Sequence, residues 1–239
     1  MTKAQPEGTA RWAVLDFNNT ASYGGPELGR AAADALVVQL AVRHRAEVAS
    51  RAEIDSGMKA QGLTFPLDTL DLLQLGASIS VRAIVTGSVL AVRHDQRGRA
   101  SVDLVVRVVD IVSGEMVNGA LVGASSVARP GVDDDVLVNE ALRKAAFAVV
   151  RQFDRFDLPI GTVLSNEGTT KVLINKGSRD GYKTGLNLIV LRQGRTTGKL
   201  RIASCDHDSS VAVVTDQGIG IRPEDRTHAV FVLPRQKGE

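Results

Sequence analysis

The sequence has few of the residues that usually build a chemical site. Of its 239 residues one is cysteine, four are histidine and 4% are aromatic. The lone Cys205 excludes an internal disulfide and any site with several thiolates. The shortage of aromatic rings leaves few platforms on which single-stranded nucleic acid could stack. With 29 basic and 27 acidic residues the net charge is +2, so no general field attracts nucleic acid or anionic lipid.

Long apolar runs are missing as well. No window approaches the roughly 18 uncharged apolar residues of a membrane-spanning helix, and the opening MTKAQPEGTAR has no apolar signal core. We therefore expect a soluble chain, whose membrane attachment would depend on a lipid anchor outside this sequence. The length and a hydrophobic content of 44% fit two folded modules.

The first part of the chain alternates between strand and helix patterns. RWAVLDFNN, residues 11–19, alternates as a buried strand, and residues 26–40 repeat apolar side chains at helical spacing. AEVAS, residues 46–50, predicts a short second strand. Two helices should follow, one ended by Gly62 and the other by Gly76.

From residue 83 the hydrophobic period changes to two. Strand patterns at 83–94, 100–112 and 115–126 predict a three-stranded antiparallel meander, with a two-residue turn at Ser113 and Gly114. One face of the central strand is apolar (Val102, Leu104, Val106, Val108). A long helix over 133–153 carries an apolar stripe that can cover such a face (Val138, Leu142, Ala145, Val149, Phe153).

From Ile160 onward the sequence has no helical window. It contains six short strand patterns divided by glycine turns, which predict a small closed β-barrel. The expected fold is therefore α+β or α/β, with a mixed sheet packed with helices over residues 11–155. A second, all-β barrel domain is expected over residues 160–234.

The stretch GSRDGYKTG, residues 177–185, is close to a phosphate-binding loop. That loop has four residues between its glycines and ends in Gly-Lys-Ser/Thr, whereas here only three residues separate Gly177 from Gly181 and an extra residue precedes Lys183. The stretch also leads into LNLIVL, a strand pattern, so no helix start would face a phosphate. We interpret it as a turn between barrel strands, with positive φ at Gly181 and Gly185. Residual anion binding is the alternative.

Two clusters contain residue types that bind metals. CDHD, residues 205–208, places a thiol, an imidazole and two carboxylates in a row, as zinc or copper ligands, but adjacent side chains rarely converge and we interpret it as a solvated turn. Asp133, Asp134 and Asp135 lack the alternating oxygen ligands and central glycine of a calcium loop. We assign them to the start of the following helix, whose dipole favours negative charge there.

Catalytic residues are not apparent. Asp16 ends the first strand, where open sheets often place chemistry, but it lacks a recognisable acid, base or metal partner. His44 and His94 lie in basic, polar segments without a nucleophile motif and are interpreted as surface residues. The tip RHDQRGR, residues 93–99, could contact phosphate or an acidic partner, or could protect a strand edge by its charge. We expect no enzyme activity and no catalytic, cofactor-binding or metal-binding residue.

Several phrases of the first module resemble a family of envelope proteins. WAVLDFNNT, ELGRAAADALVVQL, SRAEIDSGMKAQGL, AIVTGSV and VDLVVRVVDIVSGEMV are similar to the CsgG/HfaB type of lipoprotein domain, over residues 11–155. The same anticodon-binding-like architecture occurs in the amino-terminal domain of TolB, in LpoB and in the middle domain of FlgT. The barrel segment, beginning GTVLSNEGTTKVLINKG, resembles the carboxy-terminal domain of FlgT-like proteins.

The resemblance implies a non-enzymatic assembly or scaffold component of a flagellar or secretion machine. Such a protein is periplasmic, is associated with the outer membrane and binds protein partners, often copies of itself in a ring. Nucleic-acid binding is not implied, and the short hairpin turn at 95–99 leaves no membrane-crossing hairpin for a pore. An LpoB-like monomeric regulator that activates an envelope enzyme is the alternative, and a nucleotide-dependent enzyme using 177–185 is a third hypothesis.

Overall fold

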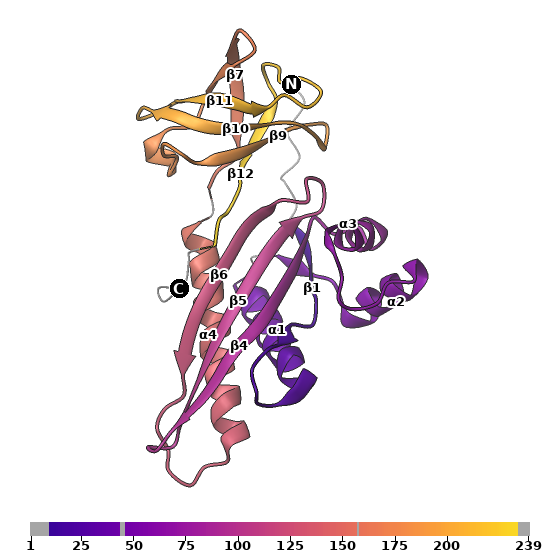
Figure 1. Ribbon diagram of the computed structural model, residues 1–239, viewed down its shortest axis with the longest axis vertical. Coiled ribbons are helices and arrows are strands. Elements are labelled where there is room, and N and C mark those ends of the chain that lie inside the picture. The colour runs from indigo at the N-terminus through magenta and orange to yellow at the C-terminus, as the bar shows by residue number, and fades with distance from the viewer. Residues whose placement is uncertain (1–9, 44–45, 157, 234–239) are drawn as a thin grey trace. The chain divides into compact units, whose positions relative to one another are not determined.

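The structure is a computed structural model that describes residues 10–43, 46–156 and 158–233. His44 and the opening segment 1–9 lie outside the described residues. The chain divides into two compact units, which Figure 1 shows in indigo to salmon and in orange to yellow. Each unit is described by itself below.

The first unit comprises residues up to Gly114 together with Gly119–Arg155. Its first elements follow the predicted alternation of strands and helices. In chain order they are β1 (Arg11–Val14), β2 (Asn18–Asn19), α1 (Gly25–Val42), β3 (Glu47–Val48), α2 (Arg51–Gln61) and α3 (Thr69–Ser78).

The predicted meander and long helix complete this unit. They are β4 (Ala83–Asp95), β5 (Arg99–Asp110), β6 (Met116–Ser125) and α4 (Asp134–Arg155). The sheet order is β3-β1-β4-β5-β6, and β2 also pairs with β4. Because β1 is parallel to β3 and β4 whereas β4 and β5 are antiparallel, the sheet is mixed, as predicted.

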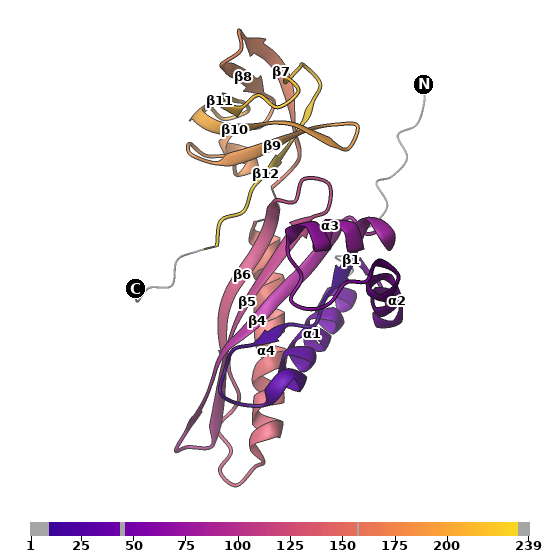
Figure 2. The ribbon, with the colours of Figure 1, turned by 45° about the vertical axis from the view of Figure 1, so that its right-hand side comes forward.

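One face of this sheet is covered by α1 and α4, which lie side by side behind it (Figures 1 and 2). The predicted apolar face of β5 is confirmed, since its four side chains are at most 1% exposed. All five residues of the predicted α4 stripe are at most 2% exposed. Trp12 of β1 meets Phe153 of α4 edge to face, with ring centroids 6.2 Å apart.

The opposite face is covered in part by α2 and α3, which pack over residues of β1 and β4 such as Ala13 and Ile84. Gly62 ends α2 with φ of +65°, as predicted. The prediction that Gly76 ends the second helix is wrong, because α3 continues to Ser78. A Cβ on Gly76 would lie 2.4 Å from a methyl carbon of Ile111, so this glycine permits close helix packing.

Two further predictions need correction. The strand expected over 11–19 is interrupted, because β1 pairs Val14 with Val85 and β2 resumes with Asn18 opposite Ser88. Between these two pairs the chain advances four residues on the β1–β2 side and three on β4, so one extra residue forms an irregularity. Helix α1 approaches the backbone closely at this point, since a Cβ on Gly29 would lie 1.8 Å from the carbonyl oxygen of Phe17.

The turn between β5 and β6 is longer than the two residues predicted. It spans residues 111–115. Asp110, which is 3% exposed, shapes it by accepting hydrogen bonds from the N–H and the hydroxyl of Ser113. The Asp110 side chain, which precedes Gly114 by four residues, therefore stabilises the turn, as aspartate commonly does through local hydrogen bonds.

The second unit comprises Phe156–Val232 and the short segment Glu115–Asn118. Its strands close into the predicted barrel in the order β10-β11-β8-β7-β12-β9. They are β7 (Gly161–Glu167), β8 (Lys171–Ile174), β9 (Asn187–Arg192), β10 (Arg195–Cys205), β11 (Ser210–Asp216) and β12 (Arg226–Ala229). Aliphatic side chains from five of these strands fill the interior, together with Tyr182 and Leu186 from the turn before β9.

A buried ion pair holds the loop that leads into β12. Arg192 of β9 donates from Nε and Nη2 to the two carboxylate oxygens of Asp225, each at 2.7 Å. Asp225 is only 3% exposed and also accepts the N–H of Arg222. Because the two charge-assisted hydrogen bonds run in parallel from one planar guanidinium, they hold this loop in a defined orientation.

Candidate functional site

The stretch 177–185 is a turn, as predicted. A single 3-10 turn, η1 (Ser178–Asp180), is followed by β9, and Gly181 and Gly185 have φ of +86° and +85°. Tyr182, which breaks the spacing of a phosphate loop, is buried in the barrel core and donates its hydroxyl to Pro159 O at 3.0 Å. Its position is that of a packing residue.

The backbone N–H groups that would hold a phosphate are occupied. Those of Ser178 and Arg179 donate to carbonyls of the 205–208 turn, and those of the next three residues donate within the loop itself. The N–H of Gly177 donates to the Asp180 carboxylate at 3.2 Å. That bond, more than the neighbouring Lys176, holds the pKa of Asp180 below its usual value. An acid thus takes the place that a phosphate would need.

The CDHD turn, residues 205–208, holds the 177–185 loop through hydrogen bonds. Its backbone carbonyls at Asp206 and His207 accept the two N–H groups, while the His207 side chain is 76% exposed. Asp208 pairs with Arg179 at 2.7 Å, and the Cys205 thiol donates to Tyr182 O at 3.3 Å. Throughout the described residues, no group of three or more His, Cys, Asp or Glu side chains is arranged to hold a metal.

The three aspartates lie at the start of α4, as predicted. The Asp133 side chain accepts the N–H of Asp135 at 2.9 Å, the arrangement of a helix cap. Asp135 accepts the Tyr23 hydroxyl, and this hydrogen bond raises the pKa of Tyr23 to about 12. His94 lies beside this group, its ring centroid 5.2 Å from that of Tyr23. These contacts tie the ends of two helices to the hairpin tip.

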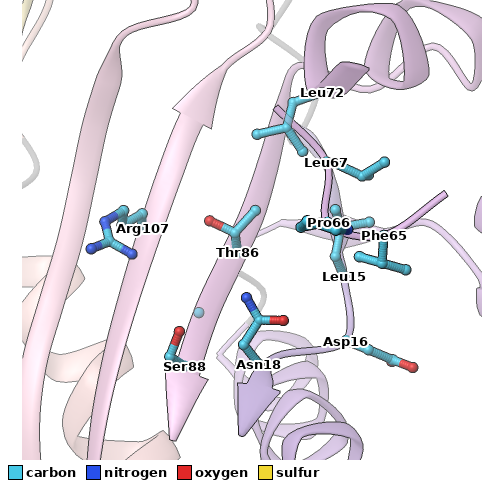
Figure 3. A pocket seen from close by; sticks show the side chains of 11 residues that line it. Leu15, Asp16, Asn18, Phe65, Pro66, Leu67, Leu72, Thr86, Ser88 and Arg107 are labelled. Atoms are coloured by element: carbon cyan, nitrogen blue, oxygen red, sulfur yellow. The ribbon is translucent and has the colours of Figure 1, made fainter. Parts of the chain in front are cut away.

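A small pocket opens on the sheet beside Asp16. Its volume is about 150 Å³. Asp16 lies at the edge of the pocket (Figure 3) and forms an ion pair with Arg51, which also binds Asp34. The pocket is therefore left with hydroxyl and amide groups from Asn18, Thr86 and Ser88 beside an apolar wall that includes Phe65 and Leu67.

This pocket lacks the parts of a catalytic centre. Its one carboxylate is already paired with arginine, and no second acid, histidine or cysteine lines it. Arg107 lines the pocket, but in Figure 3 its guanidinium lies across β5 from Thr86. A general acid or base must reach the reacting proton within hydrogen-bond distance, and these side chains do not present one.

A larger hollow lies on the outer surface of α1 and α4. Its volume is about 490 Å³, and it is lined by four apolar residues (Ala31, Ala35, Val38, Leu142) and four polar ones (Asp34, Gln39, Asn139, Arg143). Val38 is 57% exposed, and Val42, one turn further along α1, is 68% exposed. This α1/α4 groove was not predicted. The signal for it is that Val38 and Val42 fall outside the helical stripe that forms the core.

Charged side chains gather around Phe147 of α4, beside the end of α1. Phe147 of α4 is 41% exposed, and the guanidinium carbons of Arg43 and Arg151 lie 5.0 and 6.0 Å from the centre of its ring. Such distances allow cation–π attraction. Arg43 also pairs with Asp154 at 3.4 Å. Exposed apolar, aromatic and arginine side chains on the same pair of helices have the composition that protein interfaces favour.

No helix within the described ranges is both long and apolar enough to cross a membrane. Comparison with known proteins yields no matching family model and no matching curated protein. The assignment to the CsgG/HfaB or FlgT families therefore remains a prediction.

Solved structures with partial similarity do exist. The LpoB C-terminal domain from Salmonella enterica has a TM-score of 0.40 and 11% identity, covering 48% of this chain and 82% of its own. The PelC dodecamer from Paraburkholderia phytofirmans has a TM-score of 0.41 and 19% identity, covering 60% and 89%. Lipoprotein GNA1162 from Neisseria meningitidis has a TM-score of 0.40 and 13% identity, covering 54% and 88%. Similarities of this size carry no conclusion about function.

Proposed function

We propose that this protein is a non-enzymatic assembly component of the bacterial cell envelope, which works by binding other protein chains, including copies of itself. The observation that carries the proposal is the α1/α4 groove, in which Val38 is more than half exposed beside other apolar residues, with Val42 exposed one turn further along α1. Contiguous apolar surface of this kind usually marks an interaction site. The resemblance of the sequence to envelope lipoprotein domains supports the periplasmic face of the outer membrane as its location.

The energy available from the groove is sufficient to matter. The exposed part of Val38 is roughly 80 Å², and burying it would contribute about 2 kcal/mol at ~25 cal/mol per Å². Val42 and Phe147 would contribute similar amounts. A charged residue placed at Val38 should therefore abolish most of the binding and leave the fold intact, because this side chain is not part of the core.

Crosslinking in cells tests this function. A photoreactive amino acid at Val38, in the protein expressed from its chromosomal gene, should produce adducts with defined proteins in the envelope fraction. The same amino acid at Lys59, an exposed residue of α2, is the matched control and should produce none. Recovery of the protein in the cytosolic fraction, or equal labelling from both positions, would contradict the proposal.

The LpoB-like alternative uses the same groove but differs in stoichiometry. A regulator would bind a peptidoglycan synthase or another envelope enzyme through Val38 and remain a monomer. Adducts that contain only such an enzyme would favour this alternative, whereas adducts between copies of this chain would favour the assembly component.

A further inference from the structure

The α4 side of the α1/α4 groove continues as a row of three exposed side chains. Arg143 lines the groove, and residues four apart lie on the same face of a helix. Phe147 and Arg151 therefore follow it, one and two turns further along α4, and all three are exposed. On α1, which lies beside α4 (Figures 1 and 2), exposed Val38 and Val42 occupy successive turns. Apolar surface and arginines thus run along the same pair of helices.

The two arginines of this row have no acidic partner within the described part of the chain. Arg143 donates to the carbonyl oxygen of the residue one turn earlier at 3.4 Å, and Arg151 has the aromatic contact described above. Asp34 is the one carboxylate among the described residues that line the groove, and Arg51 already binds it. The charge of this row that lacks a counter-charge is therefore positive.

The spacing of the two arginines determines the spacing of the charges that can pair with them. Arg143 and Arg151 are eight residues apart, and eight residues of an α-helix rise about 12 Å. A second helix that lies along the groove covers this distance with two of its own residues seven or eight positions apart. Its apolar residues, at three- and four-residue spacing, then face the valines of α1.

A helix fits this surface better than an extended strand or a flat membrane. The hollow has a volume of about 490 Å³, and a third helix can pack a ridge of side chains into the depression between two others. A helix also satisfies its own backbone hydrogen bonds, whereas a strand would place unpaired main-chain groups against valine and alanine side chains. A bilayer surface would meet the exposed side chains but leave the hollow unfilled.

We propose that the α1/α4 groove binds an amphipathic helix of a partner protein that carries two carboxylates seven or eight residues apart, one for Arg143 and one for Arg151. This inference rests on the proposed function and states the chemistry of the partner. The apolar face of that helix packs on Val38 and Val42. Because arginine binds carboxylate in a directional, two-pronged manner, the two ion pairs fix the register of the helix along the groove.

A second copy of this chain supplies this pattern less well than a foreign helix. In α1 and at the start of α4, acids seven residues apart occur as Glu27 with Asp34 and as Asp133 with Glu140. One member of each pair, Asp34 and Glu140, is already held in an ion pair within the chain. Neither pair can therefore give both of its charges to the arginines of another copy without losing a contact of its own.

A library of helical peptides displayed on phage tests the pattern directly. Selection on the full chain, with counter-selection on Val38→Asp, should enrich peptides with an apolar face and two acids seven or eight residues apart. No enrichment, enriched peptides without such an acid pair, or enriched peptides with basic residues at these positions would overturn the inference.

Charge reversal measures the contribution of the two arginines. Arg143→Glu/Arg151→Glu should raise the dissociation constant of a selected peptide by about tenfold or more, measured by fluorescence anisotropy, because like charges then face each other. A peptide with both acids changed to arginine should bind this double variant more tightly than the wild type. Lys59→Glu/Arg195→Glu makes the same change of net charge at exposed residues elsewhere and should leave the constant within about twofold. Far-UV circular dichroism verifies that each variant is folded.

The same reversal separates this inference from the proposed function. If photocrosslinking from Val38 in cells gives the same protein adducts in the wild type and in Arg143→Glu/Arg151→Glu, the acidic helix is refuted and the proposed function stands. If Val38 gives no adduct while the selected peptides still bind, the proposed function alone fails.

Two further measurements decide against other occupants of the groove. Sedimentation velocity would assign it to a second copy if the wild type dimerises and the double variant does not. Flotation with phosphatidylglycerol vesicles would assign it to an anionic membrane if the wild type binds and the double variant does not. Either result would overturn the inference, and we expect neither.

Discussion

The approach of α1 to the strand irregularity leads to a prediction whose sign is opposite to the usual one. Gly29 lies inside α1, where replacement of glycine by alanine normally stabilises a helix by about 1 kcal/mol. Here the new Cβ would lie 1.8 Å from the Phe17 carbonyl oxygen and 2.8 Å from its carbonyl carbon. Gly29→Ala should therefore destabilise the first unit.

The size of the effect follows from these distances. A carbon and an oxygen in contact need about 3.3 Å, so α1 or the backbone of Phe17 must move by roughly 1.5 Å. Overpacking typically costs about 1–3 kcal/mol, and displacement of backbone lies at the upper end. After the helix gain is subtracted, the free energy of unfolding should fall by about 2 kcal/mol, or the Tm by about 4–8 °C.

The assay can use a built-in probe. Trp12 is the only tryptophan of the sequence and lies against Phe153 within the first unit, so its fluorescence during urea unfolding reports on that unit. Arg30→Ala, at the exposed neighbouring residue, is the control and should change stability by less than about 0.5 kcal/mol. A Gly29→Ala variant as stable as the wild type would refute the reasoning.

Three other predictions concern the barrel, the tyrosines and the glycine turn. Asp225→Asn should destabilise the second unit by about 2 kcal/mol at pH 7, measured by urea unfolding, because it removes the charge from the acceptor of two hydrogen bonds from Arg192. Burial would raise the pKa of Asp225, but the hydrogen bonds and charge of Arg192 lower it overall. The loss of unfolding free energy in the variant should therefore be present above about pH 4 and disappear as the pH falls through the pKa of Asp225 in the folded protein. Native Tyr23 and Tyr182 should show less phenolate absorbance near pH 10 than the unfolded chain, since the hydrogen bond to Asp135 and burial, respectively, raise their pKa values. Stability should decrease above pH 10 because the unfolded chain loses these protons first. Lys183→Ala should leave calorimetric titration with ATP unchanged, showing no binding in either protein.

Local patterns predicted most of the fold because they depend on alternation that the chain itself carries. The period of two in β5 placed Val106 and Leu104 in the core, and the glycines at 181 and 185 adopt the positive φ that was expected. The errors arose where a distant element decides. Gly76 resembles a helix end in the sequence, but it is retained inside α3 because Ile111 packs against it.

The surfaces were harder to predict than the core. Val38 falls outside the apolar stripe of its helix, but only the packing of α4 beside α1 shows that it lines a groove. The place of β6 at the edge of the sheet depends equally on strand order, which no periodicity encodes. Asp16 illustrates the reverse case, because its position after β1 suggested chemistry, whereas the structure shows its carboxylate paired with Arg51.

The closed order of strands in the second unit has a consequence for how this part of the protein can diverge. A ring of six strands in which each has two neighbours offers no main-chain groups to a newcomer. Recognition by this module must rely on the identity of its outward side chains, so a single substitution can change its specificity without disturbing the ladder beneath. New partners can thus be acquired one residue at a time.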